Sequence, residues 1–145
     1  DEVFQHVKES IDTLASHAKV QFEVDFTEAQ WVLFERSYMK SIFLNLISNS
    51  IKYAKPGVVP VISITTRIKD GHKKLIYKDN GLGFDMKKVG AQIFDLNNNR
   101  SDSRDNKGLG LYLVKKNVTS LGGSISVDSI ENQGSTFTIM FGDLI

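Results

Sequence analysis

The chain has 145 residues, of which 41% are hydrophobic and 10% aromatic, so it is long enough to bury the core of one ordinary domain. Its 18 Lys and Arg against 17 Asp and Glu give a formal net charge of +1, which excludes a bulk attraction to nucleic acid or to an anionic membrane. The absence of cysteine excludes disulfides and fits a reducing, cytoplasmic compartment, and no apolar run approaches a membrane span. We expect one soluble domain over residues 1–145, with no nucleic-acid partner and no direct membrane contact.

Hydrophobic periodicity predicts helices alternating with strands. Apolar residues at helical spacing predict a first helix from about Val3 to Ala18, and the alternation in VQFEVDF, starting at Val20, predicts a strand. WVLF, residues 31–34, is compatible with another short strand. The helical period returns from about Arg36 to Ala54, where Pro56-Gly57 ends it.

The second half of the chain is predicted to contain two pairs of strands. VVPVISITTRIKD and KKLIYKD read as strands joined near Asp70-Gly71. Residues 80–107 are mostly polar, and so long a loop in so small a domain is either a functional lid or disordered. A helix over Gly108–Leu121, a turn at Gly122-Gly123 and the alternating strands SISVDSI and STFTIMF follow.

The helix that contains NLISNSIKYA, residues 45–54, has one polar face. At 100° per residue, Asn45, Asn49 and Lys52 fall within an arc of about 60°, with Tyr53 at its edge. A solvated surface is the simplest explanation. An amide oxygen is, however, a good ligand for Mg²⁺, and an ammonium group suits phosphate. The helix alone leaves both explanations open.

Two glycine-containing segments also fit either a structural or a binding role. DNGLG, residues 79–83, is typical of a turn, but a carboxylate at a strand end can accept from an exocyclic amine such as that of adenine. Gly108 and Gly110 stand at a helix start, where they soften the helix or expose N–H groups that bind an anion. Neither the Walker A nor the Rossmann glycine pattern is present.

Taken in order, NLISNSIKY, DNGLGFD, KGLGLYLVKKNV and GSTFTIMF resemble the N box and the glycine boxes of the catalytic, ATP-binding (HATPase_c) domain of two-component sensor histidine kinases. The wider group includes gyrase, the heat-shock chaperone ATPases and the mismatch-repair ATPases. The resemblance covers nearly the whole chain. It implies an α+β fold, the Bergerat fold, in which a mixed, mostly antiparallel sheet packs on three helices in a two-layer sandwich. It also implies ATP and Mg²⁺ as ligands and a long ATP lid at about residues 84–107.

The resemblance implies a role for each matching residue. Asn49 matches the Mg²⁺ ligand, while Asn45 and Lys52 match phosphate-side residues and are the catalytic candidates. Asp79 matches the aspartate that hydrogen-bonds the adenine amino group, and Phe94 resembles the lid phenylalanine. The residues implied to contact the nucleotide are Asn45, Asn49, Lys52, Tyr53, Asp79, Gly81, Gly83, Phe94, Lys107, Gly108, Leu109, Gly110, Leu111 and Thr136.

Some positions depart from the family pattern or have no assigned role. Asn106 stands where the second glycine box usually begins with glycine, and because Asn tolerates positive φ we expect weakened rather than absent phosphate binding. Ser50 replaces the usual alanine after the metal-binding asparagine, which we interpret as a small change. Arg100 and Arg104 are lid cations that could reach the γ-phosphate, although neither lies in an assignable motif.

The amide at position 45 separates the subfamilies. Hydrolytic relatives have a glutamate there that activates water, whereas an amide cannot act as a general base, so we expect slow hydrolysis and transfer to an acceptor. Anti-sigma-type serine kinases have nearly this size but usually carry that glutamate, and histidine-glycine in place of Lys52-Tyr53. This alternative stays open, as does a non-catalytic, nucleotide-free interaction module, which Asn106 makes conceivable.

The resemblance also implies partners. Family members phosphorylate a histidine in a His-Glu/Asp-x-x-x-Pro context, which none of His6, His17 and His72 has. We therefore expect a γ-phosphoryl donor whose acceptor is the parent's own dimerisation domain, missing from this chain, with a response regulator receiver domain as the later partner. The isolated domain is expected to be monomeric. The sequence leaves open whether the parent protein is membrane-anchored.

Overall fold

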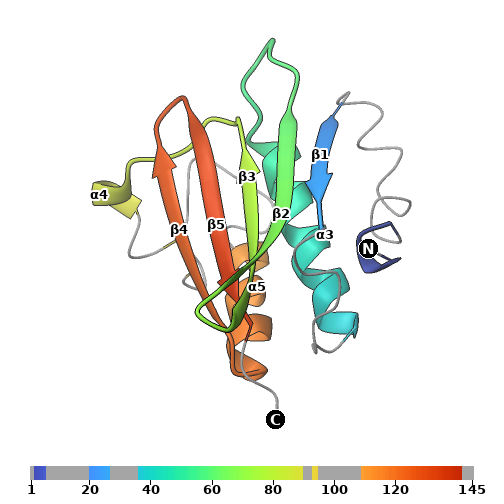
Figure 1. Cartoon of the computed structure of the whole chain (residues 1–145). Coiled ribbons are helices and arrows are strands. Elements are labelled where there is room, and N and C mark those ends of the chain that lie inside the picture. Colours follow the sequence, from blue (N-terminus) through green and yellow to red (C-terminus); the bar gives the residue numbers. More distant parts are fainter. Residues whose placement is uncertain (1, 6–19, 27–35, 90–92, 95–108, 142–145) are drawn as a thin grey trace.

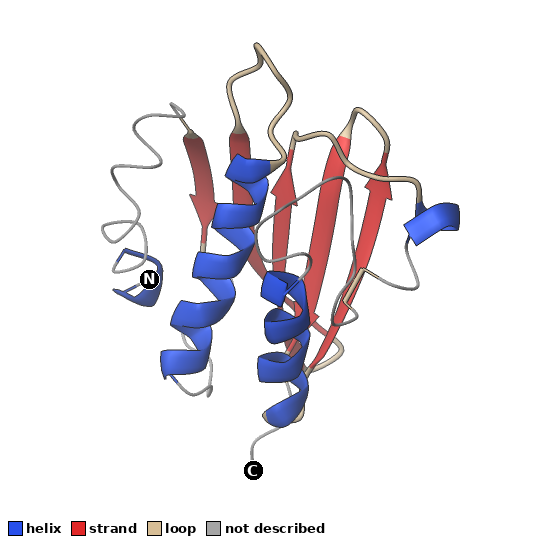
Figure 2. Cartoon of the chain, turned by 180° about the vertical axis from the view of Figure 1, so that it is seen from behind, coloured by secondary structure: helices blue, strands red, loops and turns tan. Residues whose placement is uncertain are grey.

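The computed structural model describes residues 2–5, 20–26, 36–89, 93–94 and 109–141. Five strands form one sheet in the order β1-β2-β3-β5-β4, and α3 and α5 lie side by side against one of its faces (Figures 1 and 2). The strands are β1 (Gln21–Asp25), β2 (Val61–Lys69), β3 (His72–Asp79), β4 (Ser124–Ile130) and β5 (Gly134–Met140). The labelled helices are α3 (Arg36–Lys52), α4 (Met86–Val89) and α5 (Leu109–Ser120).

The predicted α+β class and two-layer arrangement are confirmed. β1 pairs with β2 in parallel, and the other three pairs are antiparallel, so the sheet is mixed and mostly antiparallel as expected. Residues 2–5 are helical, but most of the expected first helix, the strand proposed at 31–34 and most of the proposed lid lie outside the described residues. Within the described part, no helix is both long and apolar enough to cross a membrane.

The turn between β2 and β3 shows how local sequence fixes the register of the sheet. Asp70 and Gly71 both have positive φ, 53° and 78°, which is the backbone of a two-residue hairpin turn whose twist matches the flanking strands. This turn sets the antiparallel pairing of Ile62 with Asp79 and of Ile64 with Tyr77. Asp79 therefore lies at the far end of its strand, beside the C-terminal end of α3.

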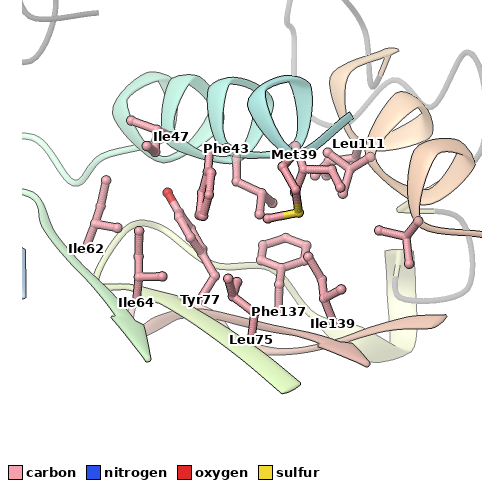
Figure 3. Packing of buried hydrophobic residues seen from close by; sticks show 14 of the residues in the cluster. Met39, Phe43, Ile47, Ile62, Ile64, Leu75, Tyr77, Leu111, Phe137 and Ile139 are labelled. Carbon is pink, nitrogen blue, oxygen red and sulfur yellow. The ribbon is translucent and has the colours of Figure 1, made fainter. Parts of the chain in front are cut away.

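The core lies between the sheet and the two helices (Figure 3). On α3, the side chains of Phe43 and Ile47 are fully buried, as the helical pattern predicts. Phe4 is 2% exposed and contacts Phe22 and Phe43 edge to face, with ring centroids 5.6 and 5.8 Å apart. The sequence pattern used Val3 instead, which is only partly buried. The buried residues labelled in Figure 3 are Met39, Phe43, Ile47, Ile62, Ile64, Leu75, Tyr77, Leu111, Phe137 and Ile139.

Two leucines on α3 test how the helix docks. Leu46 is 1% exposed, whereas Leu44 is 41% exposed on the same helix. We expect Leu46→Ala to lower the free energy of unfolding by about 2–5 kcal/mol, because it leaves a cavity. The same change at Leu44 should alter it by about 0.5 kcal/mol or less. Urea unfolding measures both, and equal losses in the two variants would show that α3 docks through a different face.

Candidate functional site

The carboxylate of Asp79 lies at the end of β3 and is held by hydrogen bonds from three parts of the chain. Its Oδ1 accepts from the backbone N–H of Gly81 at 3.1 Å and from that of Ser135 at 3.3 Å. Its Oδ2 accepts from the hydroxyl of Ser50, on α3, at 2.6 Å. Asp79 is only 8% exposed, and a buried carboxylate is tolerated when several donors stabilise its ionised form.

A second hydroxyl extends this arrangement into the core. The phenol oxygen of Tyr77 lies 2.7 Å from the hydroxyl of Ser50, which is itself 3% exposed. Because the single Ser50 proton goes to Asp79, Tyr77 donates to Ser50. Burial is the main cause that raises the pKa of Tyr77 well above 10.0; the Asp79 charge raises it too, and the Ser50 hydrogen bond opposes both. Tyr77 therefore remains a donor at neutral pH.

The DNGLG loop is fixed between α3 and the turn that joins β4 to β5. The N–H of Leu82 donates to the carbonyl of Tyr53 at 2.9 Å, and a Cβ on Gly81 would lie 2.8 Å from the same oxygen. Gly83 has φ of 64°, and a Cβ there would overlap the carbonyl of Ile130. Only glycine fits these two positions, and the loop backbone is thereby held beside Asp79.

Asn80 attaches the same loop to β2. Its Oδ1 accepts from the N–H of Val61 at 2.8 Å, and its Nδ2 donates to the carbonyl of Val59 at 3.1 Å. The side chain of Asn80 thus secures the entry to β2.

The predicted polar face of α3 meets the start of α5. A Cβ on Gly110 would lie 3.3 Å from Oδ1 of Asn45, so these two candidates are adjacent. The Nδ2 of Asn45 donates to the hydroxyl of Ser41 at 3.2 Å. Asn49 is half-buried one turn further along, directly before Ser50, and its side-chain amide makes no hydrogen bond with any residue that the structure describes.

Two lysine side chains lie over aromatic rings, one at the end of α3 and one on α5. The Nζ of Lys52, which is exposed, lies 5.6 Å from the ring centroid of Tyr53. The Nζ of Lys115, on α5, lies 5.7 Å from the ring centroid of Phe94, which packs edge to face on Phe137 at 6.2 Å. Lys115 is not among the predicted residues, which on α5 are confined to its first turn, Leu109–Leu111.

Thr136 lies near Asp79, but the side chains of the two residues lie on opposite faces of the sheet. Thr136 pairs with Lys78 and with Asp128 across the sheet, so its side chain lies on the sheet face opposite the helices. Ser135, one residue earlier, is buried on the helix side and donates its N–H to Asp79. The alternation of side chains along a strand predicts that Ser135 faces the core, since it lies two residues before the apolar Phe137.

The remaining candidates are placed only in part. Leu111 is 3% exposed, and its side chain is part of the core. Leu109 begins α5, with its side chain outside the described part. Lys107 and Gly108 lie outside the described residues, as do Arg100, Arg104 and Asn106.

A buried acceptor carboxylate flanked by glycine backbone, facing a helix with two amides, is the arrangement of an adenine-nucleotide-binding ATPase domain. Residues 34–143 match the family described as histidine kinase-, DNA gyrase B-, and HSP90-like ATPase, and the chain belongs to this family. The family resemblance seen in the motifs is therefore confirmed.

Relatives and solved structures agree with this assignment. The histidine-protein kinase ArlS of Staphylococcus aureus is 31% identical over 129 residues, which are 86% of this chain and 28% of ArlS. The chain thus spans less than a third of that relative. The mycobacterial sensor histidine kinase MprB has a TM-score of 0.78 at 25% identity, covering 97% of this chain and 93% of that one. Full-length ShkA, in complex with AMPPNP, has a TM-score of 0.77 at 22% identity, covering 97% and 29%.

The buried phenol of Tyr77 predicts a pH dependence. Its pKa is raised in the folded state, so its contribution to stability is complete below the unfolded value of about 10 and is lost as the pH rises through the folded pKa. We expect the free energy of unfolding to decline above about pH 10 more steeply in the wild type than in Tyr77→Phe. Urea unfolding at a series of pH values tests this, and parallel declines would contradict it.

Proposed function

We propose that the chain is the ATP-binding catalytic domain, spanning residues 1–145, of a sensor histidine kinase. It would donate the γ-phosphoryl of Mg-ATP to a histidine on a separate dimerisation domain, in cytoplasmic two-component signalling. The observation that carries the proposal is the Asp79 carboxylate, buried and held by three donors at the end of β3.

Base recognition is assigned to Asp79. Its oxygens can accept the exocyclic N–H of adenine, because a carboxylate offers about four acceptor sites and three are filled by protein donors. Gly81 and Gly83 leave the loop backbone without side chains beside this carboxylate, which allows a flat base to approach. Tyr53 directly follows α3, is half-buried, and is assigned as an aromatic contact for the base.

Phosphate and metal binding are assigned to the polar face of α3 and the start of α5. Asn49 fits a Mg²⁺ ligand, since its half-buried amide has no partner among the described residues and Mg²⁺ takes few protein ligands besides phosphate oxygens. The ion, when bound, neutralises phosphate charge. Gly110 allows the Asn45 side chain to pack closely on the first turn of α5, and the backbone N–H groups and helix dipole at this helix start favour an anion. Lys52 adds a nearby positive charge.

Phosphoryl transfer needs positioning and charge neutralisation more than covalent chemistry from this domain. The Asn45 amide cannot remove a proton from water, so the γ-phosphoryl is kept for an incoming imidazole that attacks in line. That imidazole belongs to the dimerisation domain, and a response regulator receiver domain is the next acceptor. ArlS and MprB are both histidine kinases, and ShkA was solved with an ATP analogue, which supports this reading.

Calorimetric titration with ADP, with and without Mg²⁺, tests the assignment. We expect the wild type to bind ADP and Asp79→Asn to weaken binding about 100-fold whether or not Mg²⁺ is present, because the amide offers a donor where an acceptor is needed. Asn49→Ala should lose only the part of the affinity that Mg²⁺ adds, and should bind like the wild type in EDTA.

Asp128→Asn is the matched control, because it makes the same chemical change on the exposed face of the sheet. It should bind ADP within about twofold of the wild type. Undiminished affinity in Asp79→Asn would reject the assignment. No binding heat in the wild type would favour a nucleotide-free module, and phosphotransfer to a serine protein would establish a serine kinase.

A further inference from the structure

We propose that Ser50 sets the base selectivity of the site by fixing the Asp79 carboxylate so that Oδ2 keeps a single acceptor position for an exocyclic amine. The inference rests on the proposed function, since it concerns how the same site reads its nucleotide. Ser50 is a positioning residue here, acting through Asp79.

The contacts that carry this inference join α3 to β3. The Ser50 hydroxyl donates to Oδ2 of Asp79 at 2.6 Å, and the Tyr77 hydroxyl donates to Ser50 at 2.7 Å. All three residues are buried: Ser50 is 3% exposed, Tyr77 0% and Asp79 8%. A hydrogen bond from a buried hydroxyl to a carboxylate is charge-assisted and short, so it restricts rotation of the carboxylate.

The number of acceptor positions left open on the Asp79 carboxylate determines which purine the site prefers. Oδ1 of Asp79 already accepts two backbone N–H groups, from Gly81 and Ser135, which fills both of its lone pairs. Oδ2 accepts only Ser50, so one lone pair is left. A purine with an amino group at position 6 can donate to it. A purine with a carbonyl there places one acceptor against another and leaves both unpaired, which disfavours binding.

Tyr77 keeps Ser50 in its donating orientation. Because Tyr77 is fully buried and its phenol remains protonated, its hydrogen atom occupies a lone pair of Ser50 and directs the Ser50 hydrogen atom to Asp79. Without the Ser50 hydroxyl, both acceptor positions of Oδ2 are open. The carboxylate is then held only by the two N–H groups on Oδ1. The preference for an amine over a carbonyl then declines.

The test compares ADP with inosine diphosphate, which has a carbonyl at position 6 in place of the amino group and a hydrogen on N1. The wild type should prefer ADP. Ser50→Ala should weaken ADP binding about tenfold while changing inosine diphosphate binding by less than about twofold, because only the amine uses the positioned oxygen. Ser50→Thr, which keeps the hydroxyl, should restore the preference. Tyr77→Phe should also reduce the preference for ADP, but by less than Ser50→Ala does.

Thr66→Val is the control for a merely structural effect. Thr66 is a buried hydroxyl residue on the helix side of β2, paired with Leu75 rather than with the Asp79 end of the sheet. Its removal should leave the ratio of the two affinities unchanged, and thermal melting confirms that each variant is folded.

The possible results separate this inference from the proposed function. A wild type that binds neither nucleotide overturns the proposed function and this inference with it. A wild type that prefers ADP, with Ser50→Ala keeping the full preference or weakening both nucleotides equally, overturns the role of Ser50 alone.

Discussion

The buried negative charge of Asp79 is the constraint on which the other features of the site depend. Its hydrogen-bond donors come from α3, from the DNGLG loop and from the first residues of β5, so the carboxylate is satisfied only when all three are in register. Removing one partner of a buried charge is strongly destabilising, because the charge remains without compensation. The same charge therefore contributes to the specification of the fold and creates the acceptor that the site presents to a ligand.

The contacts that hold Asp79 also place the polar face of α3. Ser50 is bonded to the strand, and Asn49 is the residue directly before it, so the proposed metal ligand has a fixed offset from the proposed base acceptor. The same buried side of α3 also carries the apolar residues packed between helix and sheet (Figure 3). Asn45, one turn earlier, reaches Gly110 at the start of α5. One helix thus fixes the position of the proposed metal ligand relative to the proposed base acceptor on β3.

The elements and family were predictable from sequence because their signals are local or ordered along the chain. Asp70-Gly71 defined a hairpin turn, and alternation defined β4 to the residue and β5 to within one residue at each end. The contacts of Ser50 and Ser135 were not predicted, since each depends on which residue of another element lies opposite, and a buried serine has no periodic signal of its own. Phe4 was missed because the helical pattern was counted from Val3.

A crystal structure of the protein with ADP and Mg²⁺ tests the central claim most directly. The account predicts that the amino group of adenine lies within hydrogen-bond distance of Oδ2 of Asp79, with the Ser50 hydroxyl still on the same oxygen and the Asn49 amide oxygen on the metal ion. A base bound elsewhere, or an Asp79 carboxylate that contacts only protein groups in the complex, would contradict it.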